Sequence, residues 1–292
     1  MAATVVVFSC RRRRLRGDNH MNVVANMASG TAQEGAAAGP LLEVSDVAVR
    51  FGGIVALDGV SFSVPKGIVQ GLIGPNGAGK TTLFNCLSRL YVPNQGDIRF
   101  EGQSILTMSP HGIANIGIGR TFQNLALFKT MSVLDNVMVG GHSQSSSDFV
   151  SNALRLPWVS REERQLKDGA WELIEYLELG DVAFQPVGGL PFGTQKRVEM
   201  ARALAARPKL LLLDEPAGGL NHDEVTELGD LITQIRDERD ITILLVEHHM
   251  SLVMSISDRV VAIDFGRKIG EGTPEEIQQN QDVINAYLGT PD

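Results

Sequence analysis

The stretch Gly74–Thr82, with the sequence GPNGAGKTT, constrains this chain more than any other feature. It follows Ile68–Ile73, a short apolar run with the character of a buried parallel strand. It precedes Leu83–Leu87, which indicates the first turns of a helix. A glycine-rich loop between a strand and a helix is the context that a G-x-x-x-x-G-K-[ST] phosphate loop requires.

This loop predicts a site for nucleotide phosphates. Its glycines let successive backbone N–H groups turn inward around phosphate oxygens, and the following helix adds the positive end of its dipole. We expect Lys80 to reach the β- and γ-phosphates and Thr81 to ligate Mg²⁺. The alternative is a glycine-rich turn that precedes a lysine by chance. The predicted phosphate-binding residues are Gly74, Pro75, Asn76, Gly77, Ala78, Gly79, Lys80, Thr81 and Thr82.

Two adjacent carboxylates supply the second half of a nucleotide site. Four leucines, Leu210–Leu213, predict a buried strand that ends at Asp214 and Glu215. We expect Asp214 to hold Mg²⁺, directly or through water, and Glu215 to orient or deprotonate the attacking water. A lone Asp-Glu pair after a strand is usually only a polar strand end. Together with the phosphate loop, it indicates nucleotide hydrolysis.

Strand-like runs alternate with helical patterns from Ile68 to Val246, which predicts an α/β fold with a parallel sheet. Ligands in such folds bind outside the carboxyl ends of the strands. Residues 124 to about 187 are more polar and helical, and we interpret them as an inserted helical subdomain. Helix starts are predicted at four caps or cap pairs, Ser109–Pro110, Ser132 with Asp135, Ser160 with Glu163, and Asn221 with Glu224.

The first 40 residues differ from the rest of the chain. A short apolar patch precedes Arg11–Arg14, and this order is the reverse of a secretory signal. We favour a disordered extension, with a tail for anionic surfaces or nucleic acid as the alternative. Met1, Met21 and Met27 all remain open as the natural start.

Composition restricts the class of protein. The net charge of −8 argues against a nucleic-acid partner. The two cysteines, Cys10 and Cys86, give no disulfide framework, which fits a reducing, cytosolic compartment. No apolar run approaches the ~20 residues that cross a bilayer. If the protein works at a membrane, we expect it to dock onto another subunit.

From residue 41 to 289 the pattern resembles the ABC ATPase family. The family's LSGGQ motif has a counterpart in Leu190–Thr194, LPFGT, followed by Gln195–Val198, QKRV. By similarity, Phe51 is the aromatic that stacks on adenine, and Gln123 is the glutamine near Mg²⁺. His248 is similarly the histidine that contacts the γ-phosphate.

This sequence departs from the family pattern in two motifs. Pro191 and Phe192 replace the small pair of LSGGQ, and Thr194 replaces its final glutamine. Gly218–Asn221 matches the D-loop, with Asn221 where many members have aspartate. Because Gly193 remains, the backbone can still approach a phosphate.

The resemblance implies a P-loop NTPase with a RecA-like parallel-sheet core, an antiparallel β subdomain and an inserted helical subdomain. It implies ATP and Mg²⁺ as ligands, with Thr81, Gln123 and Asp214 near the metal. Glu215, His248 and Gln123 are the implied catalytic residues. ATP is expected to lie between two ATPase subunits, identical or different, and to contact Leu190, Gly193, Thr194 and Asn221 of the second.

A closer resemblance is to the ATPases of branched-chain amino-acid importers. It rests on GRTFQN at Gly119–Asn124, on VEHHM at Val246–Met250 and on AYLG at Ala286–Gly289. The segment Gly141–Gly169 is similar to that of the longer of two such ATPases. The implied partners are membrane permease subunits and, indirectly, a solute-binding protein, at the cytoplasmic face of the membrane. The alternatives are a lipid or lipopolysaccharide exporter ATPase and a soluble ABC protein. A soluble ABC protein that acts on ribosomes would usually carry two phosphate loops, and a DNA-repair type would carry a long coiled-coil insertion.

Overall fold

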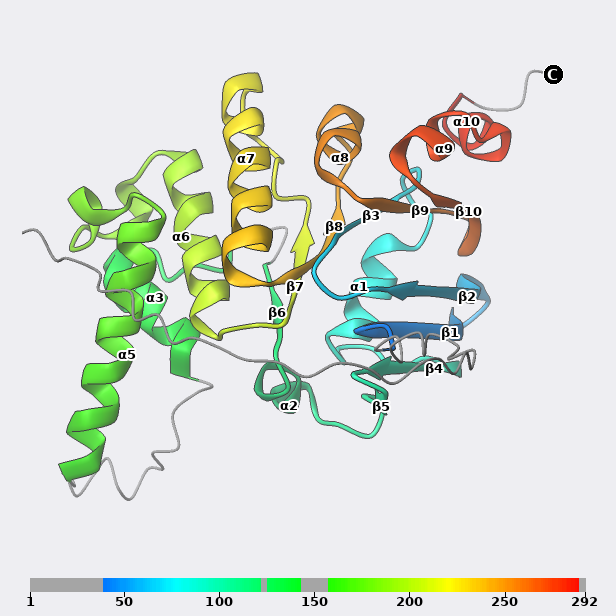
Figure 1. The fold of residues 1–292 in the computed structure, drawn as a ribbon. Coiled ribbons are helices and arrows are strands. Elements are labelled where there is room, and N and C mark those ends of the chain that lie inside the picture. The colour runs from blue at the N-terminus through cyan, green and yellow to red at the C-terminus, as the bar shows by residue number, and fades with distance from the viewer. Residues whose placement is uncertain (1–38, 122–124, 143–156, 289–292) are drawn as a thin grey trace, which may run out of the picture. The chain divides into compact units, whose positions relative to one another are not determined.

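The computed structural model describes residues 39–121, 125–142 and 157–288, and a six-stranded sheet forms the centre of this described part (Figure 1). The strand order is β10-β9-β3-β8-β7-β6, and only β10 is antiparallel to its neighbour. This confirms the predicted parallel core. The strands are β3 (Val69–Ile73), β6 (Ile118–Arg120), β7 (Leu210–Asp214), β8 (Thr242–Val246), β9 (Arg259–Asp264) and β10 (Arg267–Gly272).

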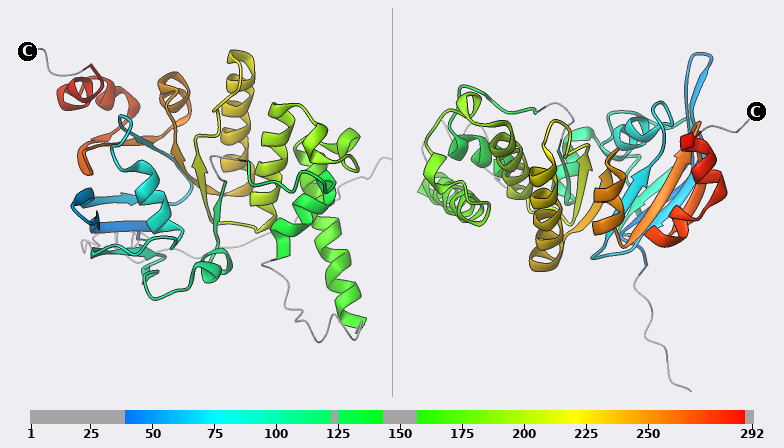
Figure 2. Two further views of the ribbon diagram at one scale, coloured as in Figure 1. Left: turned by 180° about the vertical axis from the view of Figure 1, so that it is seen from behind. Right: turned by 90° about the horizontal axis from the view of Figure 1, so that it is seen from above.

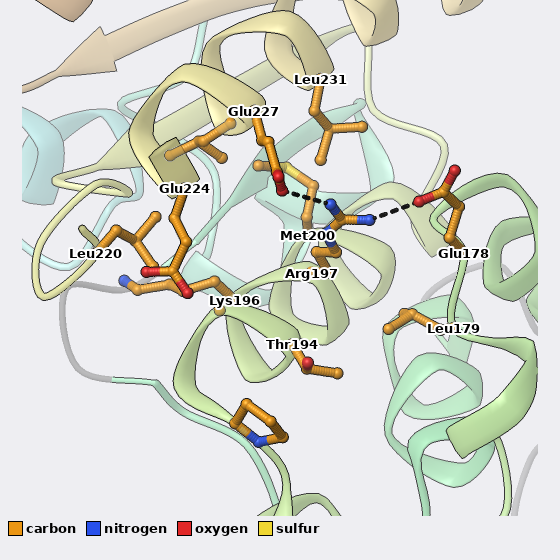
Figure 3. A pocket seen from close by; sticks show the side chains of 13 residues that line it. Glu178, Leu179, Thr194, Lys196, Arg197, Met200, Leu220, Glu224, Glu227 and Leu231 are labelled. Atoms are coloured by element: carbon orange, nitrogen blue, oxygen red, sulfur yellow. Dashed lines mark hydrogen bonds and ion pairs between the residues drawn. The ribbon is translucent and has the colours of Figure 1, made fainter. Parts of the chain in front are cut away.

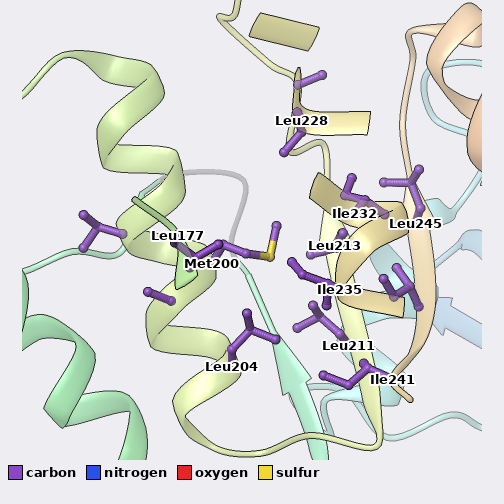
Figure 4. Packing of buried hydrophobic residues seen from close by; sticks show 14 of the residues in the cluster. Leu177, Met200, Leu204, Leu211, Leu213, Leu228, Ile232, Ile235, Ile241 and Leu245 are labelled. Atoms are coloured by element: carbon purple, nitrogen blue, oxygen red, sulfur yellow. The ribbon is translucent and has the colours of Figure 1, made fainter. Parts of the chain in front are cut away.

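The central strands are mostly apolar because both of their faces are covered. Every residue of β3, β7 and β8 is buried. Leu211 and Leu213 point to the face covered by α7 (His222–Arg239) and α8 (Met250–Ile256), as Figure 4 shows for part of this cluster. Leu210 and Leu212 point to the opposite face, covered by α1 (Lys80–Leu87).

A second, antiparallel sheet has the order β2-β1-β4-β5, which confirms the β subdomain implied by the family resemblance. Its apolar face joins the core around α1. The hairpin between its two longest strands turns at Gly52 and Gly53. The strands are β1 (Leu42–Phe51), β2 (Ile54–Val64), β4 (Gln95–Phe100) and β5 (Gln103–Ser104).

The helical part contains α3 (Val133–Gly141), α5 (Pro157–Tyr176) and α6 (Phe192–Ala205), with two short 3-10 turns, η2 (Gly180–Val182) and η3 (Val187–Gly189). These three helices pack on one another at one end of the central sheet, as both views of Figure 2 show. The limits predicted for a helical subdomain, 124–187, stay a prediction. No helix among the described residues has the length and apolarity needed to span a membrane.

Three of the four predicted helix starts are confirmed. Ser109 caps α2 (Pro110–Asn115), Ser132 caps α3, and Asn221 forms a complete capping box with Glu224 at α7. The prediction at Ser160 is wrong, because α5 has already begun at Pro157, and proline is well suited to a first helical turn. The final elements, α8, β9, β10, α9 (Pro274–Gln278) and α10 (Gln281–Leu288), have no counterpart in the sequence predictions.

A buried asparagine on α3 secures the loop that precedes this helix. The Asn136 side-chain amide donates to the carbonyls of Phe128 and Ser132 at 3.1 and 2.9 Å, and its oxygen accepts from Phe128 N at 2.9 Å. We expect Asn136→Ala to lower the free energy of unfolding by about 1–3 kcal/mol, because buried backbone groups lose their partners. Chemical denaturation measures this change. Asn115→Ala, at an exposed position in α2, is the control and should change stability by no more than about 0.5 kcal/mol. Equal effects of the two substitutions would contradict the prediction.

Candidate nucleotide site

The predicted phosphate loop connects β3 to α1, as its sequence required. Gly74 and Gly79 adopt φ values of 155° and 105°, and a Cβ on Gly74 would lie 2.1 Å from the Ile263 carbonyl oxygen. A Cβ on Gly79 would lie 2.6 Å from the Ala56 carbonyl oxygen. Glycine is therefore required at both positions, by backbone conformation and by close packing.

Lys80 begins α1 with its ammonium group turned back onto the loop. Its Nζ donates to the carbonyl oxygens of Gly74 at 2.6 Å and Pro75 at 3.0 Å. Burial lowers the pKa of Lys80 below its ordinary value, while the nearby carboxylates of Glu215 and Asp214 oppose that shift. Lys80 of the phosphate loop therefore lies close to the two predicted acidic residues, Asp214 and Glu215. Asn76, Gly77 and Thr81 are exposed on it, and Ala78 is buried beneath it.

Asp214 ends β7 with a side chain that is only 2% exposed. Its Oδ2 pairs with Arg120 Nη2 at 2.8 Å. Its Oδ1 is buried and has no hydrogen-bond partner among the described residues. A buried carboxylate oxygen without a donor fits an oxygen ligand for a hard cation such as Mg²⁺.

Arg120 is a site residue whose role the sequence analysis missed. Besides Asp214, its guanidinium contacts Asn85 Oδ1 at 2.9 Å, Ser88 Oγ at 3.0 Å and the face of the Phe84 ring. It therefore connects the helix after the phosphate loop to the acidic end of β7. The signal in the sequence for this role is a charged residue at the end of an apolar strand pattern.

Glu215 and His248 lie beside each other, because they follow the adjacent parallel strands β7 and β8. Glu215 Oε1 lies 2.6 Å from His248 Nε2. The Glu215 backbone has the left-handed φ of 50° and donates its N–H to the Val246 carbonyl at 2.8 Å. The structure thus brings together two of the three predicted catalytic residues. The third, Gln123, lies outside the described residues.

Phe51 lies at the end of β1 with 46% of its surface exposed. Its ring meets that of Tyr91 edge to face, with centroids 5.2 Å apart. An aromatic ring that is exposed on one face and supported by another ring can stack on a planar base. This geometry is compatible with the adenine contact expected from the resemblance.

The Leu190–Thr194 segment leads into α6 and borders a pocket between α6 and α7 (Figure 3). Leu190 is 8% exposed and belongs to the core, so its side chain faces inward. A Cβ on Gly193 would lie 2.9 Å from Glu224 Oε1, and none of its neighbours belongs to the phosphate loop of this chain. Asn221 Oδ1 accepts from Glu224 N at 3.0 Å, which assigns this side chain to capping α7.

Sequence comparison gives two family matches. The model of the ABC transporter family matches residues 57–218. A second model, described as branched-chain amino acid ATP-binding cassette transporter, matches residues 267–292. The second match covers β10, α9 and α10, elements that lie after the last predicted strand.

Individual relatives are similar over nearly their whole length. The high-affinity branched-chain amino acid transport ATP-binding protein BraF of Pseudomonas aeruginosa is 46% identical over 250 residues, 86% of this chain and 98% of the relative. LivG of Escherichia coli, described in the same words, is 42% identical with the same coverage. A crystal structure of a nucleotide-free ATP-binding cassette from an ABC transporter has a TM-score of 0.74 and 31% identity, covering 85% of this chain and 99% of that one. A structure of the ADP conformation of an ATP-binding cassette also has a TM-score of 0.74, at 30% identity, covering 85% of this chain and 98% of that one.

The buried pair between Arg120 and Asp214 yields a stability prediction. We expect Arg120→Ala to lower the free energy of unfolding by about 3–5 kcal/mol, because it leaves a buried carboxylate without its cation. The control is Arg99→Ala, which removes an arginine paired with Asp97 at the surface and should change the free energy of unfolding far less, because solvent screens an exposed ion pair. Denaturant titration of both variants measures the difference. If Arg120→Ala costs no more than Arg99→Ala, the Arg120–Asp214 pair does not stabilise the fold.

Proposed function

The chain belongs to the ABC transporter family, and from this premise we propose that it is the ATP-hydrolysing subunit of an importer for branched-chain amino acids. The ATPase activity follows from the family. The proposed transport role is supported by the match of residues 267–292 and by relatives described as branched-chain amino acid transport ATP-binding proteins. These similarities do not favour a lipid or lipopolysaccharide exporter or a soluble ABC protein.

We propose that ATP binds along the carboxyl edge of the central sheet. Phe51 would stack on the adenine, and Gly74–Thr82 would surround the phosphates, with Lys80 reaching the β- and γ-phosphates. Lys80 Nζ now donates to the carbonyls of Gly74 and Pro75 in its own loop, and we propose that phosphate oxygens would replace these acceptors on binding.

Mg²⁺ fits the residues at this edge. We propose Asp214 Oδ1, Thr81 and Gln123 as the groups that would hold it, directly or through water. The observation that supports this choice is the buried Oδ1 without a hydrogen-bond donor among the described residues. When bound, the ion would supply positive charge to the β- and γ-phosphate oxygens.

The observation that carries the proposed chemistry is the 2.6 Å contact between Glu215 and His248. We propose that Glu215 accepts a proton from the attacking water and that His248 holds the carboxylate in place. As the oxygen of water bonds to the γ-phosphorus, the bond to the bridging oxygen breaks, leaving ADP and phosphate. His248 is exposed, and we propose that its ring also contacts the γ-phosphate.

We further propose that the chain works as one of two ATPase subunits, identical or different, beneath membrane permease subunits. It would lie peripherally at the cytoplasmic face, and a solute-binding protein would act through the permease. Gly193 and Thr194 would face the partner's nucleotide. Because Leu190 is buried, its part in this contact would be to hold the segment in place. The extension expected at residues 1–40 lies, apart from Gly39 and Pro40, outside the described residues, and we propose 41–289 as the ATPase domain.

The proposed general base gives a direct test. We expect Glu215→Gln to retain ATP binding and to lower the rate of ATP hydrolysis by ~10²–10⁴-fold, the usual contribution of general-base catalysis. Phosphate release measures turnover, and a fluorescent ATP analogue measures binding. Glu101→Gln, which changes an exposed glutamate paired with Lys209, is the control and should hydrolyse ATP as the wild type does. Unchanged hydrolysis by Glu215→Gln would show that Glu215 is not the base.

The shared site can be tested through Gly193. In a Glu215→Gln background, which prevents turnover, we expect Gly193→Asp to abolish ATP-driven dimer closure while each subunit still binds ATP. The added carboxylate would face the partner's phosphate, and these charges repel each other in a partly dry site. Light scattering measures closure, with and without a second ATPase chain.

A new carboxylate at Gly193 would also lie close to Glu224 in its own chain. Gly180→Asp adds the same charge where a Cβ meets nothing within 4 Å and therefore serves as the control. Circular dichroism checks that each variant is folded. Normal closure of the Gly193→Asp variant would exclude this segment from the nucleotide interface.

A further inference from the structure

A buried glutamate joins the two chain segments that carry the proposed catalytic pair. Glu247 follows β8 directly and is 1% exposed. Its Oε1 accepts the backbone N–H of Ala217 at 2.7 Å. Its Oε2 accepts the N–H groups of His248 at 2.7 Å and His249 at 3.1 Å. One carboxylate therefore binds the chain after β7 and the chain after β8 at the same time.

The two segments joined in this way have different tasks in the proposed function. Ala217 directly precedes Gly218–Asn221, the segment that resembles the D-loop, and it follows Glu215 by two residues. The N–H of His248 belongs to the residue whose ring contacts Glu215. The backbone hydrogen bond from Glu215 N to Val246 O and that side-chain contact also connect the two segments.

We propose that Glu247 is a positioning residue that holds the Glu215–His248 pair in register and couples it to the Gly218–Asn221 segment. This inference rests on the proposed ATPase site and adds a residue to it. Glu247 does not touch the reacting atoms. It acts by fixing the backbone on both sides of the pair, so that a shift of Ala217 is passed to His248.

The carboxylate suits this role better than any neutral side chain of similar size. An ionised glutamate only accepts hydrogen bonds, and it does so with both oxygens. Glu247 faces N–H donors on both sides, from Ala217 and from His248 with His249. A glutamine would have to turn its own N–H₂ group toward one set of these donors. Glu247→Gln therefore keeps the volume of the side chain but removes the hydrogen bonds to one of the two chain segments.

The test compares Glu247→Gln with the wild type. We expect kcat for ATP hydrolysis to fall by roughly 10²-fold, the effect of a displacement of about 1 Å in a positioned group. The affinity for a fluorescent ATP analogue should stay within about twofold of the wild type, because the hydrogen bonds of the Glu247 carboxylate go to Ala217, His248 and His249, which are not part of the phosphate loop. Glu247→Asp keeps the charge but shortens the reach of the carboxylate, so its kcat should lie between those of the wild type and Glu247→Gln.

Thr242→Val is the matched control at the opposite end of the same strand. Its hydroxyl is fully buried and accepts the N–H of Gly67 at 2.9 Å, so the substitution also removes an acceptor from a backbone donor. We expect Thr242→Val to lower the melting temperature and leave kcat within about twofold of the wild type. If both variants lose stability and activity in parallel, Glu247 is only a structural residue and the inference is wrong.

A double-mutant cycle with His248→Ala supplies the decisive readout. If Glu247 acts through His248, Glu247→Gln should lower kcat by less than about threefold in the His248→Ala background, against roughly 10²-fold alone. Independent, multiplying effects would overturn the inference. Failure of the proposed function is recognised separately, because Glu215→Gln would then hydrolyse ATP at the wild-type rate. Wild-type kcat in Glu247→Gln, together with an impaired Glu215→Gln, would overturn the role of Glu247 alone.

Discussion

The parallel pairing of β7 with β8 is the constraint on which the site depends. Asp214 is paired with Val246, so the residues that follow both strands emerge at the same level of the sheet. A shift of one residue in either strand would turn its side chains to the opposite face, exchanging Leu211 and Leu213 for Leu210 and Leu212. It would also separate Glu215 from His248. The packing of the core on both faces therefore fixes the geometry of the proposed catalytic pair.

Energetically unfavourable groups are concentrated at the carboxyl edge of the central sheet, and specific hydrogen bonds or ion pairs offset each of them. Glu215 holds a left-handed backbone that costs a non-glycine residue about 1–3 kcal/mol, and its N–H is satisfied by Val246. Asp214 is a buried charge with one oxygen paired to Arg120, and the other oxygen is the proposed ligand for Mg²⁺. Glu247 is a second buried carboxylate, satisfied by backbone donors. Asp214, Glu215 and Glu247 lie at or just after the carboxyl ends of β7 and β8, and the only polar residue in the rest of these two strands is Thr242, at the opposite end of β8.

The sequence predicted the parts of the site that are local in the chain. The phosphate loop from Gly74 to Lys80, the run ending at Asp214 and the capping box at Asn221 all depend on neighbours within a few residues. Arg120 and Glu247 act across 94 and 30 residues, on Asp214 and Ala217, and no local pattern marks such contacts. The last strand, β10, has the sequence RKIGEG and a register shift against β9, so it lacks the alternation that indicates a strand.

Phe192, the aromatic residue of the LPFGT segment, packs against Gly219 of the Gly218–Asn221 segment, and this contact gives a structural reason for its presence. A Cβ on Gly219 would lie 2.9 Å from the Phe192 ring, so the ring packs where only a glycine leaves space. Gly219 also has the positive φ of 83°. Lys196 lies over the Phe192 ring, 5.6 Å from its centroid. The replacement of a small residue by phenylalanine thus joins two segments proposed to face the partner subunit. Because Phe192 directly precedes Gly193, its packing on Gly219 places the Gly218–Asn221 segment beside the residue that precedes the glycine proposed to receive the partner's phosphate.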